Sequence, residues 1–218
     1  MKKHSVIVLG ATGACGKELV YSLIKNPNFD RVTIFTRNET KIRSPKLVNH
    51  TIDFSKLQEY KKLIVGDILF SALGTTLKEA GSKSNQYEVD FTYQYEFAKM
   101  ASQNGVSSYS LISSAGANEK SLFFYPRIKG ELEIAVTNLS FEIIRIFQPP
   151  LLIRQPDLIR PAELIGIKLF NALNKIGILM QQKPLSVFDL AKIMTKESIS
   201  YKEEKIIKYT PKELHDLA

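Results

Sequence analysis

With 218 residues, 44% of them hydrophobic, the chain is long enough for one domain with a buried core, which excludes a disordered protein. The single cysteine, Cys15, excludes an internal disulfide, and no apolar run reaches the ~20 residues that span a bilayer. The net charge of +8 comes from lysines that acidic residues interrupt, which is typical of a solvated basic face rather than a nucleic-acid site. We therefore expect a cytoplasmic protein that neither inserts into a membrane nor binds nucleic acid.

Short apolar runs alternate with helical patterns along most of the chain. Runs typical of buried strands span residues 6–9, 32–35, 47–52, 67–72, 109–112 and 141–146. Helical patterns span residues 19–24, 56–62, 87–103 and 128–137. Strands that alternate with helices form parallel sheets through right-handed crossovers. The sequence therefore predicts an α/β fold, a Rossmann-like doubly wound parallel sheet with helices on both faces.

From Pro149 onward this alternation loosens. A loop with several prolines precedes helical patterns at residues 162–175 and 187–195 and a strand pattern at residues 205–209. Doubly wound sheets bind their ligands at the carboxyl ends of the strands. We predict that residues 1–218 form a single domain, in which residues 149–218 contribute a small substrate-side lobe at those ends.

A glycine loop, Gly10-Ala-Thr-Gly13-Ala-Cys-Gly16, follows the first strand and opens a helix. In this context Gly10 permits a tight turn, Gly13 lets backbone amides approach a pyrophosphate, and Gly16 permits close packing of the helix on the sheet. The helix N-terminus then offers free N–H groups to the phosphates, and the hydroxyl of Thr12 can add a donor or brace the loop. The alternative, a mere packing turn, is a weaker explanation of this spacing in this context.

Two small residues inside this loop, Ala14 and Cys15, complete the predicted cofactor contacts. A thiol near a helix N-terminus can become reactive, because the positive end of the helix dipole favours the thiolate. The alternative is that Cys15 is a small filler that does not clash with the cofactor.

The end of the second strand distinguishes NAD from NADP. An NAD site places a carboxylate there for the ribose 2′-hydroxyl, whereas this sequence has Thr36-Arg37-Asn38. The guanidinium of Arg37 suits a 2′-phosphate, so we predict that NADPH is preferred over NADH. A surface arginine without this role is the alternative.

Tyr125 and Lys129 are four residues apart, so they lie on one face of a helix. The ammonium group favours the phenolate form of the tyrosine, which allows Tyr125 to act as the acid in carbonyl reduction while Lys129 also holds the nicotinamide ribose. Ser114, after the fifth strand, is placed to bind a substrate carbonyl. An ordinary amphipathic helix is the alternative explanation of the Tyr-x-x-x-Lys spacing alone.

With these motifs the chain resembles the atypical short-chain dehydrogenase/reductases, and most of all the subgroup of the Tat-interacting tumour-suppressor oxidoreductase and bacterial NAD(P)-binding relatives. The resemblance spans nearly the whole chain. Its most specific strings are Leu73-Gly-Thr-Thr76 and Lys129-Gly-Glu-Leu-Glu133. It implies an NADP(H)-binding oxidoreductase in which Ser114, Tyr125 and Lys129 match the catalytic triad.

The resemblance also implies further cofactor contacts. Asp53 and Phe54 would hold the adenine, although Asp53 is also a candidate helix N-cap. The residues after the fourth strand would line the cofactor: Ala72, Leu73 and Gly74. One departure concerns Gln148-Pro149-Pro150, which stands where relatives usually carry Arg-Pro-Gly.

Two functions therefore remain open. The first is an NADP(H)-dependent oxidoreductase that reduces a small carbonyl compound, which the Ser-Tyr-Lys set favours. The second is a non-catalytic NADP(H)-sensing regulator with a protein partner, for which the altered loop at residues 148–150 leaves room. The three histidines are isolated and lack metal-ligand spacing, so no metal site is predicted.

Overall fold

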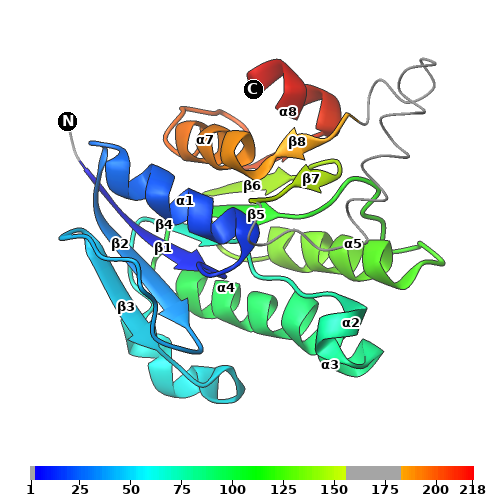
Figure 1. Cartoon of the computed structure of the whole chain (residues 1–218), viewed down its shortest axis with the longest axis horizontal. Helices are drawn as coiled ribbons and strands as arrows, with labels where there is room; N and C mark the ends of the chain where they lie inside the picture. Colours follow the sequence, from blue (N-terminus) through cyan, green and yellow to red (C-terminus); the bar gives the residue numbers. More distant parts are fainter. Residues whose placement is uncertain (1–2, 156–182) are drawn as a thin grey trace.

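Seven parallel strands form the central sheet of the described chain, which in this computed structural model comprises residues 3–155 and 183–218 (Figure 1). Across the sheet the strands follow the order β3-β2-β1-β4-β5-β6-β9. This order confirms the predicted Rossmann-like doubly wound sheet. The strands are β1 (His4–Leu9), β2 (Phe29–Thr36), β3 (Leu47–Thr51), β4 (Ile68–Ser71), β5 (Ser108–Ile112), β6 (Ile143–Phe147) and β9 (Ile206–Tyr209).

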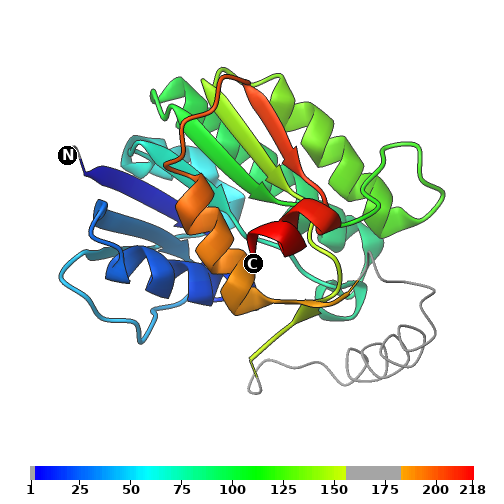
Figure 2. The same ribbon diagram turned by 90° about the horizontal axis from the view of Figure 1, so that it is seen from above.

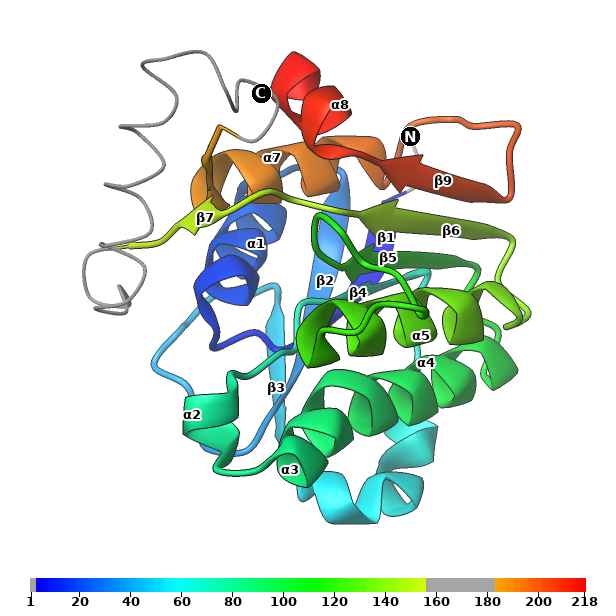
Figure 3. The same ribbon diagram turned by 90° about the vertical axis from the view of Figure 1, so that its right-hand side faces the viewer.

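Helices cover both faces of this sheet, as Figure 3 shows. One face carries α1 (Ala14–Lys25), α7 (Val187–Glu197) and α8 (Pro211–Leu217). The other carries α4 (Tyr93–Gln103), α5 (Phe124–Thr137) and the 3-10 segment η1 (Phe54–Leu63). Three short segments lead into α4: α2 (Leu77–Ala80), α3 (Lys83–Tyr87) and the π-helical turn η2 (Glu88–Thr92).

The strands read as continuous apolar runs because both of their faces are buried. Side chains of a strand alternate between the two faces of its sheet. In β1, Val6 and Val8 therefore pack into the cluster under α1, while Ile7 and Leu9 pack on the other face with Phe97 of α4. Burial of each such side chain contributes about 1.5–3 kcal/mol to the stability of the fold. Strand β1 therefore stabilises the packing of helices on both faces of the sheet.

The strand order reverses between β1 and β4, whose carboxyl ends lie side by side. The backbone N–H of Ala72, just after β4, donates to the carbonyl of Leu9 at 2.9 Å. A doubly wound sheet has its ligand crevice at such a reversal, because the chain leaves the two strands in opposite directions. The glycine loop after β1 and residues 72–74 after β4 thus meet at one place.

The described C-terminal elements belong largely to the main body of the fold. Figure 2 shows β9 beside β6, and the N–H of Gln148 donates to the carbonyl of Tyr209 at 2.9 Å. Helix α7 lies on α1, where the hydroxyl of Thr195 donates to that of Ser22 at 2.9 Å. The predicted strand at 205–209 and helix at 187–195 are therefore present, but as parts of the main sheet and helix layer rather than of a lobe. The predicted helix at 162–175 lies outside the described residues.

Three C-terminal elements were not predicted. Two short strands, β7 (Leu152–Ile153) and β8 (Leu185–Ser186), pair with each other in parallel. Helix α8 begins with a capping box, in which the backbone N–H of Thr210 donates to Glu213 at 2.7 Å and Pro211 occupies the first turn. This helix had a sequence signature, since Thr-Pro-x-Glu combines a cap with a proline.

Candidate functional site

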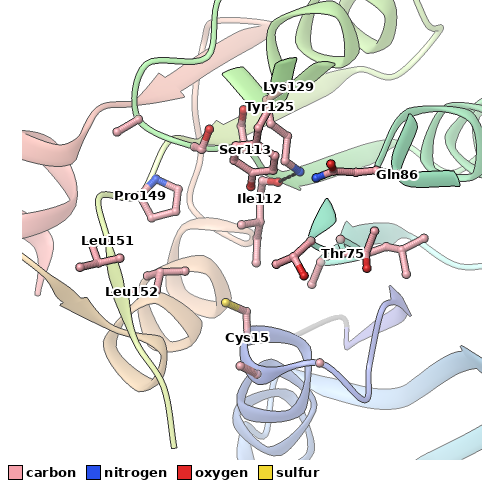
Figure 4. A pocket seen from close by; sticks show the side chains of 18 of the residues that line it. Cys15, Thr75, Gln86, Ile112, Ser113, Tyr125, Lys129, Pro149, Leu151 and Leu152 are labelled. Atoms are coloured by element: carbon pink, nitrogen blue, oxygen red, sulfur yellow. Dashed lines mark hydrogen bonds between the residues drawn. The ribbon is translucent and has the colours of Figure 1, made fainter. Parts of the chain in front are cut away.

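A cavity of about 720 Å³ opens at the carboxyl ends of β1, β4 and β5. Its walls come from the glycine loop, the loop after β4, the end of β5, the start of α5 and the loop after β6 (Figure 4). It brings together many of the residues that the sequence predicted for the cofactor and for catalysis: Gly13, Ala14, Cys15, Ala72, Leu73, Gly74, Ser114, Tyr125 and Lys129. The sulfur of Cys15 faces this cavity in Figure 4.

Two glycines of the loop allow the backbone to pack closely, because neighbouring backbone atoms occupy the space that a side chain would need. Gly10 has a φ of +84°, and a Cβ on it would lie 2.5 Å from the backbone nitrogen of Leu73. A Cβ on Gly16 would overlap the carbonyl oxygen of Gly10. Both positions therefore require glycine for the loop itself to form. Neither lines the cavity, and Thr12 is exposed outside it.

Gly13 differs from these two glycines, because the protein leaves open space beside it. It has an ordinary φ of −74°, and among the described residues a Cβ on it would meet only the Gly10 carbonyl oxygen, at 3.5 Å. Helix α1 starts at the next residue with no side-chain cap, which leaves its first N–H groups for a ligand. Space next to uncapped amides at a helix N-terminus fits the pyrophosphate of a dinucleotide.

Helix α5 presents both predicted catalytic side chains to the cavity. Pro126 lies in its first turn, where proline is tolerated, so the helix starts early enough to include Tyr125. Tyr125 is 41% exposed, whereas Lys129, one turn later, is 3% exposed and donates from Nζ to the carbonyl of Ile112 at 3.2 Å. The buried ammonium group is thus anchored to the end of β5.

The two serines after β5 have different environments. The Oγ of Ser114 is buried and has no hydrogen-bond partner among the described residues. Ser113 instead donates from Oγ to the carboxylate of Glu133 at 2.5 Å. Of the two hydroxyls at this cavity wall, only that of Ser114 therefore lacks a hydrogen-bond partner in the part of the chain that the structure describes.

Glu133 connects four elements behind the site, although the sequence analysis gave it no role. It is 3% exposed and lies one turn after Lys129 on α5. Besides Ser113, it accepts from Nε2 of Gln148 at 2.8 Å and from Nζ of Lys208 at 2.9 Å. Its spacing from Lys129 was a usable signal, since residues four apart share a helix face.

Two further buried polar residues stand beside the cavity without a signal in the sequence. Gln86 is 3% exposed, and Figure 4 shows its amide turned toward Lys129. Asp90 is fully buried and accepts from the backbone N–H of Thr75 at 3.3 Å, which holds the loop after β4. Their positions depend on how α3 and η2 pack beside the sheet, which local sequence does not reveal.

The residues predicted for the adenine end lie outside the cavity lining. Arg37 is exposed after β2. Asp53 accepts from the backbone N–H of Ser55 at 2.9 Å, so it is the N-cap of η1, which was the alternative role. The ring of Phe54 lies 5.6 Å from that of Tyr93.

The charged groups that shift the pKa of Tyr93 show that Arg37 and Asp53 both lie near its ring. Burial and the carboxylate of Glu88 raise the pKa of Tyr93 to about 12, with Asp53 adding to the shift and Arg37 opposing it. A tyrosine ring, a cation and a carboxylate therefore gather at the ends of β2 and β3.

Comparison with known proteins agrees with this geometry. Residues 10–135 match a protein-family model described as NAD(P)H-binding. Protein HTATIP2 of Rattus norvegicus is 34% identical over 79% of this chain and 73% of its own length. The mitochondrial protein Fmp52 of Emericella nidulans is 40% identical over 79% of this chain and 77% of its own.

A solved structure supports the fold alone. The Bordetella bronchiseptica enzyme WbmG in complex with NAD superposes with a TM-score of 0.70 at 12% identity, over 96% of this chain and 73% of that one. At this identity the match carries no information about substrate.

The expected cytoplasmic location is wrong. Fmp52 relatives from Emericella nidulans, Aspergillus fumigatus and Candida albicans are named as mitochondrial proteins. The sequence features behind the expectation were the lack of a secretory signal and of a bilayer-length apolar run, and neither separates the cytoplasm from an organelle.

Two properties of residues 3–155 and 183–218 complete the description of the site. No helix there has the length and apolar character needed to cross a membrane. Nor do three or more His, Cys, Asp or Glu side chains gather there as a metal site. From its family match and its relatives, the chain belongs to the NAD(P)H-binding atypical short-chain dehydrogenase/reductases, in the group of HTATIP2 and the Fmp52 proteins.

Proposed function

We propose that this protein is an NADP(H)-dependent oxidoreductase that reduces a small carbonyl compound. The observation that carries this proposal is the convergence of Ser114, Tyr125 and Lys129 on the cavity that Gly13 also lines. The proposed dinucleotide site and the proposed proton donor thus share one cavity, as hydride transfer to a carbonyl requires.

The cavity walls suit the pyrophosphate and the nicotinamide end of the cofactor. Gly13 and the start of α1 would hold the pyrophosphate, because this space is open and the helix has no side-chain cap. Residues 72–74 would form the wall beside the nicotinamide, and Lys129 would bind its ribose. When bound, the reduced nicotinamide supplies the hydride that adds to the carbonyl carbon.

The protein's own residues handle the oxygen and the proton. Ser114 donates a hydrogen bond to the substrate carbonyl oxygen, and its buried Oγ has no competing partner among the described residues. Tyr125 transfers its phenolic proton to the same oxygen as the alcohol forms. The ammonium group of Lys129, held at the Ile112 carbonyl, stabilises the phenolate that remains.

Preference for NADPH is part of the proposal. Arg37 is exposed at the end of β2 and forms no ion pair among the described residues, so its guanidinium remains available for a phosphate. The N-cap role of Asp53 engages its Oδ1 with Ser55. The carboxylate of Asp53 is thereby fixed in place at the N-terminus of η1.

The second candidate function is an NADP(H)-binding regulator without turnover. It is favoured by Pro149 and Pro150, which line the cavity where relatives usually have Pro-Gly. Proline fixes φ, so this wall is stiffer than a glycine-containing loop.

Steady-state kinetics separates the two functions. We expect wild-type protein to oxidise NADPH in the presence of at least one member of an aldehyde and ketone panel, after calorimetry has verified NADPH binding. Tight NADPH binding without turnover of any member would favour the regulator.

A further inference from the structure

The charged side chains that line the cavity are all positive. They are Lys83, Lys129 and Arg154, and none of the lining residues that the structure describes is acidic. The ammonium of Lys129 donates to the Ile112 carbonyl and serves the catalytic centre. The charge of Lys83 has no such assignment.

Lys83 faces the cavity beside the proposed proton donor. It is the first residue of α3, which the side chain of Ser82 caps. Its Nζ lies 5.5 Å from the ring centroid of Phe124, a cation–π distance, and Phe124 directly precedes Tyr125. Lys83 is exposed and forms no ion pair within residues 3–155 and 183–218. The aromatic contact thus holds an ammonium group without an ion-pair partner among the described residues, next to the residue that precedes Tyr125.

The same cavity also has apolar wall residues on three segments. Leu77 lies on α2, Phe124 begins α5, and Leu151 and Leu152 follow β6. Gly13, which would hold the pyrophosphate, comes from the loop before α1 on a different wall. A ligand beside Tyr125 would thus find apolar side chains and the ammonium group of Lys83 in one cavity, whose other cations are Lys129 and Arg154.

We propose that the substrate is a carbonyl compound with an apolar body and an anionic group, and that Lys83 selects it through that group. The inference rests on the proposed function, since it names the substrate class of the same cavity. A carboxylate and a phosphate ester share the required charge.

The test measures binding without turnover. The protein is loaded with NADP⁺, which cannot reduce an aldehyde, and calorimetry gives the Kd of three probes: 4-carboxybenzaldehyde, its uncharged methyl ester, and 4-formylphenyl phosphate. At low ionic strength we expect the carboxylate to bind about twofold to fivefold more tightly than the ester, as for an exposed ion pair. The phosphate probe, compared with the carboxylate, shows which anion fits better.

The variant Lys83→Gln should remove this preference, and Lys83→Glu should reverse it. The control Lys78→Gln removes the same charge from neighbouring α2, outside the cavity lining, and should leave the preference unchanged. An equal preference in wild type and Lys83→Gln would overturn the inference, as would the absence of binding by every probe.

Two further outcomes separate a failure of this inference from a failure of the proposed function. If Lys83→Gln weakened NADP⁺ binding while leaving the probe preference unchanged, Lys83 would be a cofactor residue and the inference would be wrong. If the preference followed Lys83 but no aldehyde were ever reduced, the proposed function would fail while the anion site stood.

Discussion

Lys208 of β9 and Glu133 of α5 form an ion pair, with Nζ 2.9 Å from Oε2, although 75 residues separate them in sequence. The Glu133 side chain is 3% exposed and that of Lys208 is 50% exposed. Gln148 donates to the same carboxylate at 2.8 Å. The positive charge that balances Glu133 therefore comes from the last strand of the sheet.

Removing this cation should destabilise the protein. Lys208→Met leaves a buried carboxylate with only the neutral donors of Ser113 and Gln148, so we expect a loss of about 1–2 kcal/mol, less than for a fully buried pair because Lys208 is half exposed. Urea denaturation at neutral pH measures the loss. Lys205→Met, just before the same strand, is the matched control and should change stability by less than about 0.5 kcal/mol. Equal effects of the two variants would contradict a special role for Lys208.

The glycine loop gives a second pair of variants. Gly13→Val should keep the fold, because φ at Gly13 is ordinary and its Cβ position is open, yet it should abolish NADPH binding by filling the pyrophosphate space. Gly16→Val should unfold or strongly destabilise the protein, since its Cβ would overlap the Gly10 carbonyl. Circular dichroism reports folding and calorimetry reports binding. Normal NADPH binding by Gly13→Val would place the phosphate site elsewhere.

Arg37 tests the cofactor preference. We expect wild-type protein to bind NADPH more tightly than NADH, because the 2′-phosphate carries about −1.5 to −2 charges that a guanidinium can pair with. Arg37→Ala should remove most of this difference while leaving NADH binding nearly unchanged. The control is Arg31→Ala, which removes an exposed arginine near the start of the same strand. Equal Kd values for NADPH and NADH in the wild-type protein would contradict the predicted preference for NADPH.

Much of the fold was predictable because its signals are local. A strand buried on both faces gives an unbroken apolar run, as in β1, and a glycine loop between a strand and a helix marks the dinucleotide site. The i, i+4 pair of Tyr125 and Lys129 places both side chains on one helix face, and the structure has both lining the cavity.

The remaining features depend on contacts between distant segments. The pairing of β9 with β6, and with it the contact of Lys208 with Glu133, joins parts of the chain that no periodicity relates. Gln86 of α3 lines the cavity and Asp90 of η2 holds the loop after β4 only because these short segments pack beside the sheet as they do. Asp53 fitted two roles in sequence, and its hydrogen bonds to Ser55 show the capping one.

Glu197 predicts how stability depends on pH. Burial alone would raise its pKa, but hydrogen bonds from Tyr209 at 2.8 Å and the ammonium of Lys202 at 3.1 Å leave the pKa below its ordinary value of 4.5. A carboxylate with a depressed folded-state pKa stabilises the protein above its unfolded pKa, and this stabilisation is lost as pH falls through the folded value. The stability advantage of wild type over Glu197→Gln should therefore shrink on acidification.

Urea denaturation from pH 7 down to about pH 3.5 checks this dependence. The exposed Glu142→Gln serves as the control and should run parallel to wild type over the whole range. A gap between wild type and Glu197→Gln that stayed constant with pH would show that the carboxylate charge does not contribute.

The role of the tyrosine is tested by Tyr125→Phe, which removes the phenolic proton and keeps the ring. On the best substrate of the panel, with NADPH saturating, we predict that kcat falls by at least ~10², the usual contribution of a positioned general acid, while the Kd for NADPH stays within about twofold of wild type. Tyr201→Phe, at an 86% exposed position, should match wild type in both measurements. Unchanged kcat in Tyr125→Phe would contradict the proposed chemistry, because the proton would then have to come from another group.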